Sequence, residues 1–168
     1  MERIQSMDPI VNEKSRVLIL GTMPGGDSLK EQKYYCNINN LFWDIMFRIC
    51  SSGWPMFKEA LGISYEERKQ LLLDNEIALW DILKSCEREG NTDSKICNEE
   101  LNDIQRFLCE HPNIQKVCFN GDKAHSYYLK NKSLFPENIE YKKLYSTSPS
   151  SPINSFAILS EWKENLGI

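Results

Sequence analysis

Short apolar runs, each ending in a glycine or a polar residue, constrain the fold of this chain more than any other feature of its sequence. Residues 16–21 (Arg-Val-Leu-Ile-Leu-Gly) have the pattern of a buried strand that ends at a turn. Residues 77–80 and 117–121 repeat the pattern, and residues 141–145 are a weaker example. These four runs predict the strands of one sheet.

The segments between the runs have the periodicity of amphipathic helices. Ser28 with Glu31, and Ser64 with Glu67, have the spacing of capping boxes, which begin helices. Gly167 is a typical stop for the last helix. The predicted helices begin at Ser28 or cover residues 41–49, 64–75, 101–108, 123–129 and 156–166. Strands that alternate with helices predict an α/β fold with a largely parallel sheet.

Composition places the chain among ordinary globular domains. Its 168 residues are enough to bury one core, and 41% of them are apolar. Neither a linker nor an internal repeat interrupts them, so residues 1–168 are predicted to form a single domain. No apolar run approaches the roughly 20 residues that cross a bilayer, and the first residues lack the apolar segment of a signal peptide. We therefore expect a monomer in the cytoplasm with no membrane partner.

The cysteines and histidines argue against a metal centre. The chain has six cysteines without a CxxC pair, and only two histidines, His111 and His125. Structural zinc and iron–sulfur sites usually contain a short-spaced cysteine pair. We expect the cysteines to be reduced and mostly to fill the core, and we expect no metal and no cofactor.

The glycine-rich segment after the first strand departs from the pattern of a nucleotide site. Residues 21–28 (Gly-Thr-Met-Pro-Gly-Gly-Asp-Ser) resemble a Walker A loop, but Asp27 stands where the lysine would meet the phosphates. A carboxylate there reverses the electrostatics. No GxGxxG motif is present either, which argues against a dinucleotide cofactor.

Four polar segments follow the predicted strands, where sites of open α/β sheets lie. They are residues 21–27, Asp81, residues 120–121 and residues 146–152. For each segment, a purely structural role is the alternative to a role in a functional site. Asp81 could be a general base or cap the next turn, and Asn120 could enter the crevice or form a turn. Residues 146–152 could contact phosphates or cap the last helix through Ser151.

Two tyrosines and three asparagines precede the helix predicted at residues 41–49. Asn39 or Asn40 could be its N-cap. Aromatic rings beside amides are also what a pocket for a planar base requires, because they supply a stacking face and hydrogen-bonding groups. The formal net charge of −4 argues mildly against nucleic-acid binding, although lysines gather in the second half of the chain, where a local basic face could form.

The order of these segments resembles the uracil-DNA glycosylase superfamily. Gly21-Thr-Met-Pro-Gly, then Tyr35 five residues before Asn40, then Leu-Phe-Trp43, resembles its first motif region. The similarity is closest to the hypoxanthine (deoxyinosine) DNA glycosylase branch, and mismatch-specific uracil glycosylases are more distant. The other matching segments run in the family's order and are Ile77-Ala-Leu-Trp-Asp81 with Ser85-Cys86 and Arg88, Phe119-Asn-Gly121 and Ser146-Thr-Ser-Pro149.

The resemblance implies a three-layer α/β/α sandwich around a four-stranded, mostly parallel sheet, and an enzyme that needs no metal or cofactor. It implies a base-excision repair enzyme that binds DNA containing deaminated bases, hypoxanthine above all, with uracil and xanthine as further candidates. The implied catalytic residue is Asn40. The implied base-binding residues are Gly21, Thr22, Met23, Pro24, Tyr35, which stacks on the base, and Asn120, which reads its edge. The implied DNA-binding residues are Lys123 and the loop Ser146, Thr147, Ser148, Pro149 and Ser150, which grips phosphates and helps to open the duplex.

Two positions depart from the family pattern. At the position of Met23, mismatch-specific relatives carry an asparagine, and that asparagine positions the attacking water. A thioether cannot take this role, so we assign it to Asn40, as the hypoxanthine branch implies. Asn37-Ile38 stands where relatives often carry His-Pro, which loosens the loop that holds Asn40.

The hydrogen-bonding groups along the edge of each base explain which substrates are expected. Hypoxanthine presents N1–H beside O6, and uracil presents N3–H beside O4, so an asparagine can accept from the first group and donate to the second. Adenine and cytosine present the opposite polarity, and each unpaired polar group costs about 1–3 kcal/mol. The main alternative is a nucleobase- or lesion-binding module without catalysis, which Met23 and the acidic charge favour. A nucleotide-hydrolysing enzyme that uses residues 21–28 is the third interpretation.

Overall fold

The computed structural model describes residues 1–51 and 62–168. Four parallel strands form the central sheet, in the order β3-β2-β6-β7. They are β2 (Val17–Gly21), β3 (Ile77–Asp81), β6 (Lys116–Asn120) and β7 (Glu140–Leu144). All four strands predicted from the apolar runs are present, within one or two residues of the expected ends.

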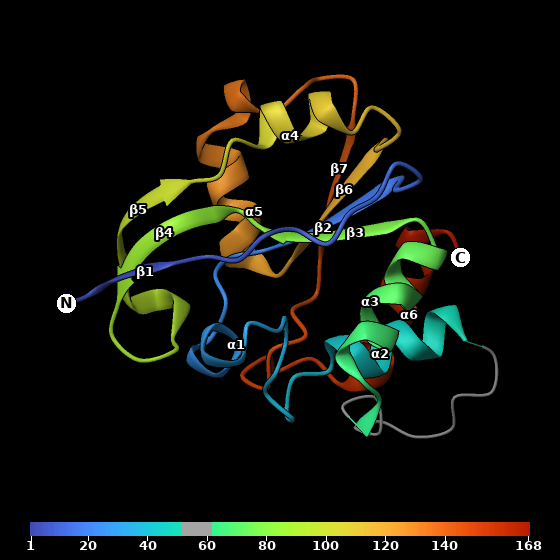
Figure 1. Cartoon of the computed structure of the whole chain (residues 1–168), viewed down its shortest axis with the longest axis horizontal. Helices are drawn as coiled ribbons and strands as arrows, with labels where there is room; N and C mark the ends of the chain where they lie inside the picture. The colour runs from blue at the N-terminus through green and yellow to red at the C-terminus, as the bar shows by residue number, and fades with distance from the viewer. Residues whose placement is uncertain (52–61) are drawn as a thin grey trace.

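Helices cover both faces of this sheet, as Figure 1 shows. One face carries α2 (Phe42–Cys50), α3 (Tyr65–Asp74) and α6 (Ser155–Leu166). The other carries α4 (Ile104–Glu110) and α5 (Asp122–Lys130). A short helix, α1 (Gly26–Glu31), follows β2. The predicted three-layer α/β/α sandwich with a four-stranded parallel sheet is confirmed.

Alternation along the strands divides the core into two clusters. Ile19 of β2 faces the cluster that contains Trp43 and Trp162, under α2, α3 and α6. Leu18 and Leu20 face the opposite cluster, under α4 and α5. Successive side chains of a strand point to opposite faces, so a strand buried on both faces is continuously apolar. This is why the runs were visible in the sequence.

A second, antiparallel sheet was not predicted. It has the order β1-β4-β5 and consists of β1 (Arg3–Gln5), β4 (Leu83–Arg88) and β5 (Ile96–Leu101). No residue of β5 is buried, and its sequence, Ile-Cys-Asn-Glu-Glu-Leu, carries no strand signal. It is a strand because β4 offers it a hydrogen-bonding edge. The predicted helix at residues 101–108 therefore begins later, at Ile104, after the N-cap Asp103.

The helix ends were predicted with mixed success. Ser64 and Glu67 form the predicted capping box, and Gly167 ends α6 with φ of 67°. The prediction at Ser28 was wrong, because Ser28 is buried inside α1 and its Oγ accepts a hydrogen bond from the Cys36 backbone N–H. The N-cap of α6 is Asn154 and not Ser151. Phe156 at the start of the predicted apolar stripe is 74% exposed.

The remaining composition-based expectations can be compared with the described residues. All six cysteines are free, but only Cys86 and Cys118 are buried, so most of them do not fill the core. Within residues 1–51 and 62–168, no helix is both long and apolar enough to span a bilayer.

Candidate active site

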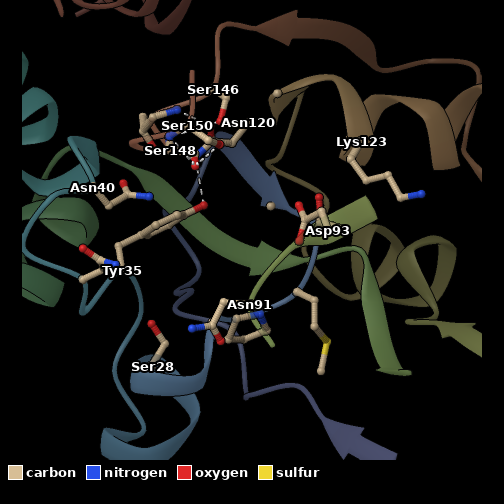
Figure 2. A pocket seen from close by; sticks show the side chains of 18 of the residues that line it. Ser28, Tyr35, Asn40, Asn91, Asp93, Asn120, Lys123, Ser146, Ser148 and Ser150 are labelled. Carbon is tan, nitrogen blue, oxygen red and sulfur yellow. Dashed lines mark hydrogen bonds between the residues drawn. The ribbon is translucent and has the colours of Figure 1, made fainter. Parts of the chain in front are cut away.

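A pocket of about 430 Å³ lies at the carboxyl ends of the parallel strands, where the polar segments were expected to meet. Figure 2 shows side chains from several loops around it. Every residue predicted to bind the base or DNA, and the predicted catalytic residue, lines this pocket. They are Gly21, Thr22, Met23, Pro24, Tyr35, Asn40, Asn120, Lys123, Ser146, Thr147, Ser148, Pro149 and Ser150.

Asn120 joins three segments of the pocket wall. Its Nδ2 donates hydrogen bonds to the Tyr35 hydroxyl at 3.0 Å and to Thr147 Oγ1 at 2.9 Å. Its Oδ1 accepts from the Thr147 backbone N–H at 3.0 Å. A backbone N–H can only donate, so this contact fixes which end of the amide is oxygen. Both amide hydrogens are therefore in use, and only one lone pair of Oδ1 remains for a ligand (Figure 2).

The aromatic ring of Tyr35 is held firmly. It stacks on Phe42, with 4.1 Å between ring centroids and 21° between planes, and its backbone has φ of +53°. Burial raises the pKa of the phenol, as does the nearby Asp81 carboxyl, while the bond from Asn120 lowers it. The phenol is therefore protonated at neutral pH and retains one hydrogen to donate.

The N-cap of α2 is Leu41, so the prediction of Asn39 or Asn40 as its N-cap was wrong. Asn40 lines the pocket, as predicted. Its Oδ1 accepts a hydrogen bond from the Phe42 backbone N–H at 2.9 Å, at the start of α2. The adjacent Leu41 backbone N–H donates to the Thr147 carbonyl at 3.0 Å, which fixes the loop against residues 146–150. Figure 2 shows the amide of Asn40 beside the ring of Tyr35.

Met23 lines the same pocket but belongs to the core. It is 7% exposed and packs in the cluster under α4 and α5. Its neighbour Pro24 presents a carbonyl that accepts a hydrogen bond from Arg88 Nη2 at 2.7 Å. This part of the wall is therefore apolar and rigid, and no side-chain amide is available at position 23 to hold water.

Asp81 and Gly21 end neighbouring strands and lie side by side in the sheet register. Asp81 is 4% exposed, and its Oδ2 has no hydrogen-bond partner among the described residues. Burial raises the pKa of this carboxyl to about 7; the charge of Asp93 adds to the rise, and Arg88 opposes it. Asp81 is thus a carboxyl group that can carry a proton near neutral pH.

One wall of the pocket was missed from sequence. It is the segment after β4 that contains Asn91, Thr92 and Asp93. Asn91 Oδ1 accepts from the Gly26 backbone N–H at 2.7 Å, and Asp93 lies 3.9 Å from Arg88 Nη1. Arg88, with a side chain 1% exposed, holds the wall in place. A buried arginine requires acceptors, but the burial of Arg88 is known only from the structure, so no sequence signal marked this wall.

Residues 146–150 form a tight polar rim. Ser146 Oγ accepts from the Ser148 backbone N–H at 3.1 Å, and the hydroxyl oxygens of Ser148 and Ser150 are 2.9 Å apart. Gly121 permits this close packing, since its φ is +96° and a Cβ atom there would lie 3.0 Å from the Ser146 Cβ. Residues with such φ values are normally glycine.

Two of the lysines in the second half of the chain are paired with carboxylates. Lys143 is paired with Asp122 at 2.9 Å, and Lys116 lies 3.5 Å from Glu140. Lys123 lines the pocket, and its side chain extends away from Asp93 in Figure 2. Lys123 therefore brings positive charge to the pocket of a chain whose formal net charge is −4.

Comparison with known proteins decides the family. The model of the "Uracil DNA glycosylase superfamily" matches residues 9–165. The chain belongs to the uracil DNA glycosylase superfamily. The predicted resemblance and the prediction of a DNA glycosylase are confirmed.

Two curated relatives are similar to this glycosylase over most of its length. One is the Hypoxanthine DNA glycosylase of Methanosarcina barkeri, 36% identical over 123 residues, which are 73% of this chain and 74% of that protein. The other, of the same name, is from Methanosarcina acetivorans and is 36% identical over 118 residues, 70% and 71% of the two chains.

A solved structure has the same fold as this glycosylase. It is the solution NMR structure of a Methanosarcina acetivorans protein provisionally described as a uracil DNA glycosylase. The TM-score is 0.81 at 31% sequence identity, over 98% of this chain and 97% of that one.

The contacts of Arg88 predict its effect on stability. Arg88→Met keeps most of the side-chain volume but leaves the carbonyls of Pro24 and Gly90 without their donor. We expect the free energy of unfolding in urea to fall by about 1–3 kcal/mol. Arg106→Met is the control, because Arg106 is paired with Glu110 on an exposed helix face, and its loss should cost less than about 1 kcal/mol. Equal losses in the two variants would show that Arg88 does not hold the wall.

Proposed function

We propose that this glycosylase removes hypoxanthine from DNA, with uracil and xanthine as further candidate substrates. The names of the two curated relatives support the choice of hypoxanthine. The observation that carries the proposal is the single pocket at the strand ends. It brings a stacked tyrosine, two asparagines and the polar rim of residues 146–150 together.

The proposed reaction is hydrolysis of the bond between the base and C1′ of the sugar. The nucleotide turns out of the duplex into the pocket, and a water molecule attacks C1′. The bonding electron pair leaves with the base, the base gains a proton, and the water oxygen keeps one hydrogen as the new sugar hydroxyl. The protein must therefore place a water, stabilise charge on the departing base and hold the extruded nucleotide.

Asn40 is the proposed catalytic residue. Its Oδ1 has a second lone pair beyond the one that accepts from the Phe42 backbone N–H, and the amide can orient a water toward C1′. An amide is a poor proton acceptor, so this role is positioning more than deprotonation. The apolar environment of Met23 supports the assignment, because it offers no alternative group on that wall.

Tyr35 and Asn120 are the proposed contacts to the base. Tyr35, supported from behind by Phe42, would stack on the extruded ring. Asn120 would accept from N1–H through the remaining lone pair of Oδ1. For its Nδ2 to donate to O6, Asn120 must give up its hydrogen bond to Tyr35 or the one to Thr147.

The remaining proposals concern DNA and the state of the enzyme. The backbone N–H groups and hydroxyls of residues 146–150, with Lys123, would bind phosphates beside the lesion. We propose a monomer that acts in the cytoplasm without metal or cofactor.

The direct test is incubation with oligonucleotides that each carry hypoxanthine, uracil or xanthine, followed by alkaline cleavage at the abasic site. We expect cleavage with hypoxanthine and none with the ordinary bases. Binding to the hypoxanthine oligonucleotide without any cleavage would instead support a binding module without catalysis.

Asn40→Ala should lower single-turnover excision by at least about 100-fold, because a positioned group of this kind contributes on the order of 10²–10⁴-fold. Binding to lesion DNA should change little. Asn39→Ala is the matched control, since Asn39 is exposed and does not line the pocket, and it should retain most activity. A loss of thermal stability that accounts for the loss of activity would favour a purely structural role for Asn40, through its hydrogen bond with the Phe42 backbone N–H.

Asn120→Asp tests the contact to the base. The two partners of Nδ2 are hydroxyl groups, which can turn and donate to a carboxylate, so the variant should fold. It has no N–H to offer the base and repels the negative charge that develops there. We expect single-turnover excision to fall by about 10²–10³-fold. An unchanged rate would leave Asn120 as a residue that only holds the loop.

A further inference from the structure

Tyr35 has a backbone conformation that its residue type rarely adopts. Its φ of +53° lies in the left-handed region, where the Cβ atom of a side chain crowds the following carbonyl oxygen. Glycine and, less often, asparagine or aspartate are the usual residues in this region. A tyrosine stays there only where the surrounding structure holds it. The residues that hold it therefore decide where the ring lies.

Two contacts of the Tyr35 side chain depend on this conformation. The ring stacks on Phe42, and the hydroxyl accepts a hydrogen bond from Asn120 Nδ2 at 3.0 Å. Both contacts require one angle between the ring and the backbone. A rotation to the more common negative φ would turn the ring away from both partners. The left-handed conformation is thus a condition for the wall of the pocket that Tyr35 forms.

Two side chains fix the peptide groups on either side of Tyr35. Before it, the Tyr34 carbonyl accepts a hydrogen bond from Trp43 Nε1 at 2.8 Å. After it, the Cys36 backbone N–H donates to Ser28 Oγ at 3.2 Å. The φ and ψ angles of Tyr35 are the only soft rotations between these two planar groups. Because both groups are hydrogen-bonded, neither turns freely.

Ser28 is bound to both ends of the short segment that carries Tyr35. Its carbonyl accepts from the Lys33 backbone N–H at 3.0 Å, and its hydroxyl oxygen accepts from Cys36. The residue is 5% exposed and lines the pocket, and in Figure 2 it lies on the same side of the pocket as Tyr35. One serine of α1 therefore sets the path of residues 33–36.

Trp43, which holds the other side, belongs to the core. It is 1% exposed, its ring contacts Tyr65 edge-on at 6.2 Å, and the Arg68 guanidinium lies 5.4 Å from its ring centroid. A change at Trp43 would disturb this packing as well as the hydrogen bond. At Ser28, in contrast, removal of one oxygen atom removes the hydrogen bond alone.

We propose that Ser28 is a positioning residue for base excision, because its hydroxyl holds Tyr35 in the left-handed conformation that presents the ring to the extruded base. The inference rests on the proposed function. Ser28 acts through the Cys36 amide and touches neither the base nor the sugar. Its role is therefore separate from the start of a helix that the sequence predicted for it.

The test is single-turnover excision from hypoxanthine DNA by wild type and Ser28→Ala at saturating enzyme. The alanine variant leaves the Cys36 N–H without its acceptor, so Tyr35 should relax toward negative φ and lose its place against the base. We expect the rate to fall by about 10- to 100-fold, the scale of one base–aromatic stacking contact.

Ser15→Ala is the matched control. Ser15 is 1% exposed, and its Oγ also accepts from a backbone N–H, that of Asn12 at 3.1 Å, but it does not line the pocket. Both variants remove a buried acceptor, so both should lower the free energy of unfolding by similar amounts. Ser15→Ala should nevertheless keep the wild-type rate of excision. Equal losses of rate in the two variants would overturn the proposal.

NMR of the free protein reports the backbone of Tyr35 directly. The NOE between its amide and α hydrogens is strong at positive φ, where these two hydrogens are close. It should be strong in wild type and in Ser15→Ala, and weak in Ser28→Ala. A Ser28→Ala variant that keeps the strong NOE would overturn the proposal, and so would one that loses it but excises at the wild-type rate.

A binding measurement separates this proposal from the proposed function. Wild type that excises no hypoxanthine would overturn the excision reaction. The position of the ring can then be tested with an oligonucleotide that carries 2′-fluoro deoxyinosine, a nucleotide that resists cleavage. Ser28→Ala should bind this oligonucleotide more weakly than wild type and Ser15→Ala do. Equal binding by all three proteins would overturn the role of Ser28, whether or not hypoxanthine is excised.

Discussion

The side chain of Asn120 forms three hydrogen bonds that join the end of β6 to Tyr35 and to Thr147. The rest of the pocket depends on this arrangement. Thr147 in turn accepts from the Leu41 backbone N–H through its carbonyl, so the loop before α2 is attached to the same point. A single amide thereby sets the separation between the stacking tyrosine, the asparagine at position 40 and the polar rim. Asn120 is the last residue of β6, a buried strand of the central sheet, so the sheet holds this amide in place.

The strand ends could be predicted from sequence because each buried strand stops at a visible change of residue type. Asn120 follows an apolar run, and Gly21 ends another. Parallel strands bring their carboxyl ends to one edge, so residues distant in sequence were expected to meet there. The same logic placed Asp81 at this edge. Its role stayed open, because burial and the neighbouring charge of Asp93 are properties of the packed structure.

The wall after β4 could not be predicted in the same way. β5 is polar and becomes a strand only through pairing with β4, so no periodicity marks it. Asp93 reaches the pocket because Arg88 is buried and recruits the carbonyl of Pro24 and the carboxylate beside it. The contact between Arg88 and Pro24 joins residues 64 positions apart in the chain. Local patterns in a single sequence do not contain that information.

The charge of the pocket limits how the enzyme can hold DNA. Asp81 and Asp93 both line it, and two ionised carboxylates would oppose the phosphates of a bound strand. Burial disfavours ionisation of Asp81, and Arg88 lies beside Asp93, so the interior is close to neutral. This favours our proposal that phosphates are held at the rim, by the backbone N–H groups and hydroxyls of residues 146–150 and by Lys123. Recognition of the proposed kind would depend on neutral hydrogen bonds more than on release of counterions, which suits a chain with a formal charge of −4.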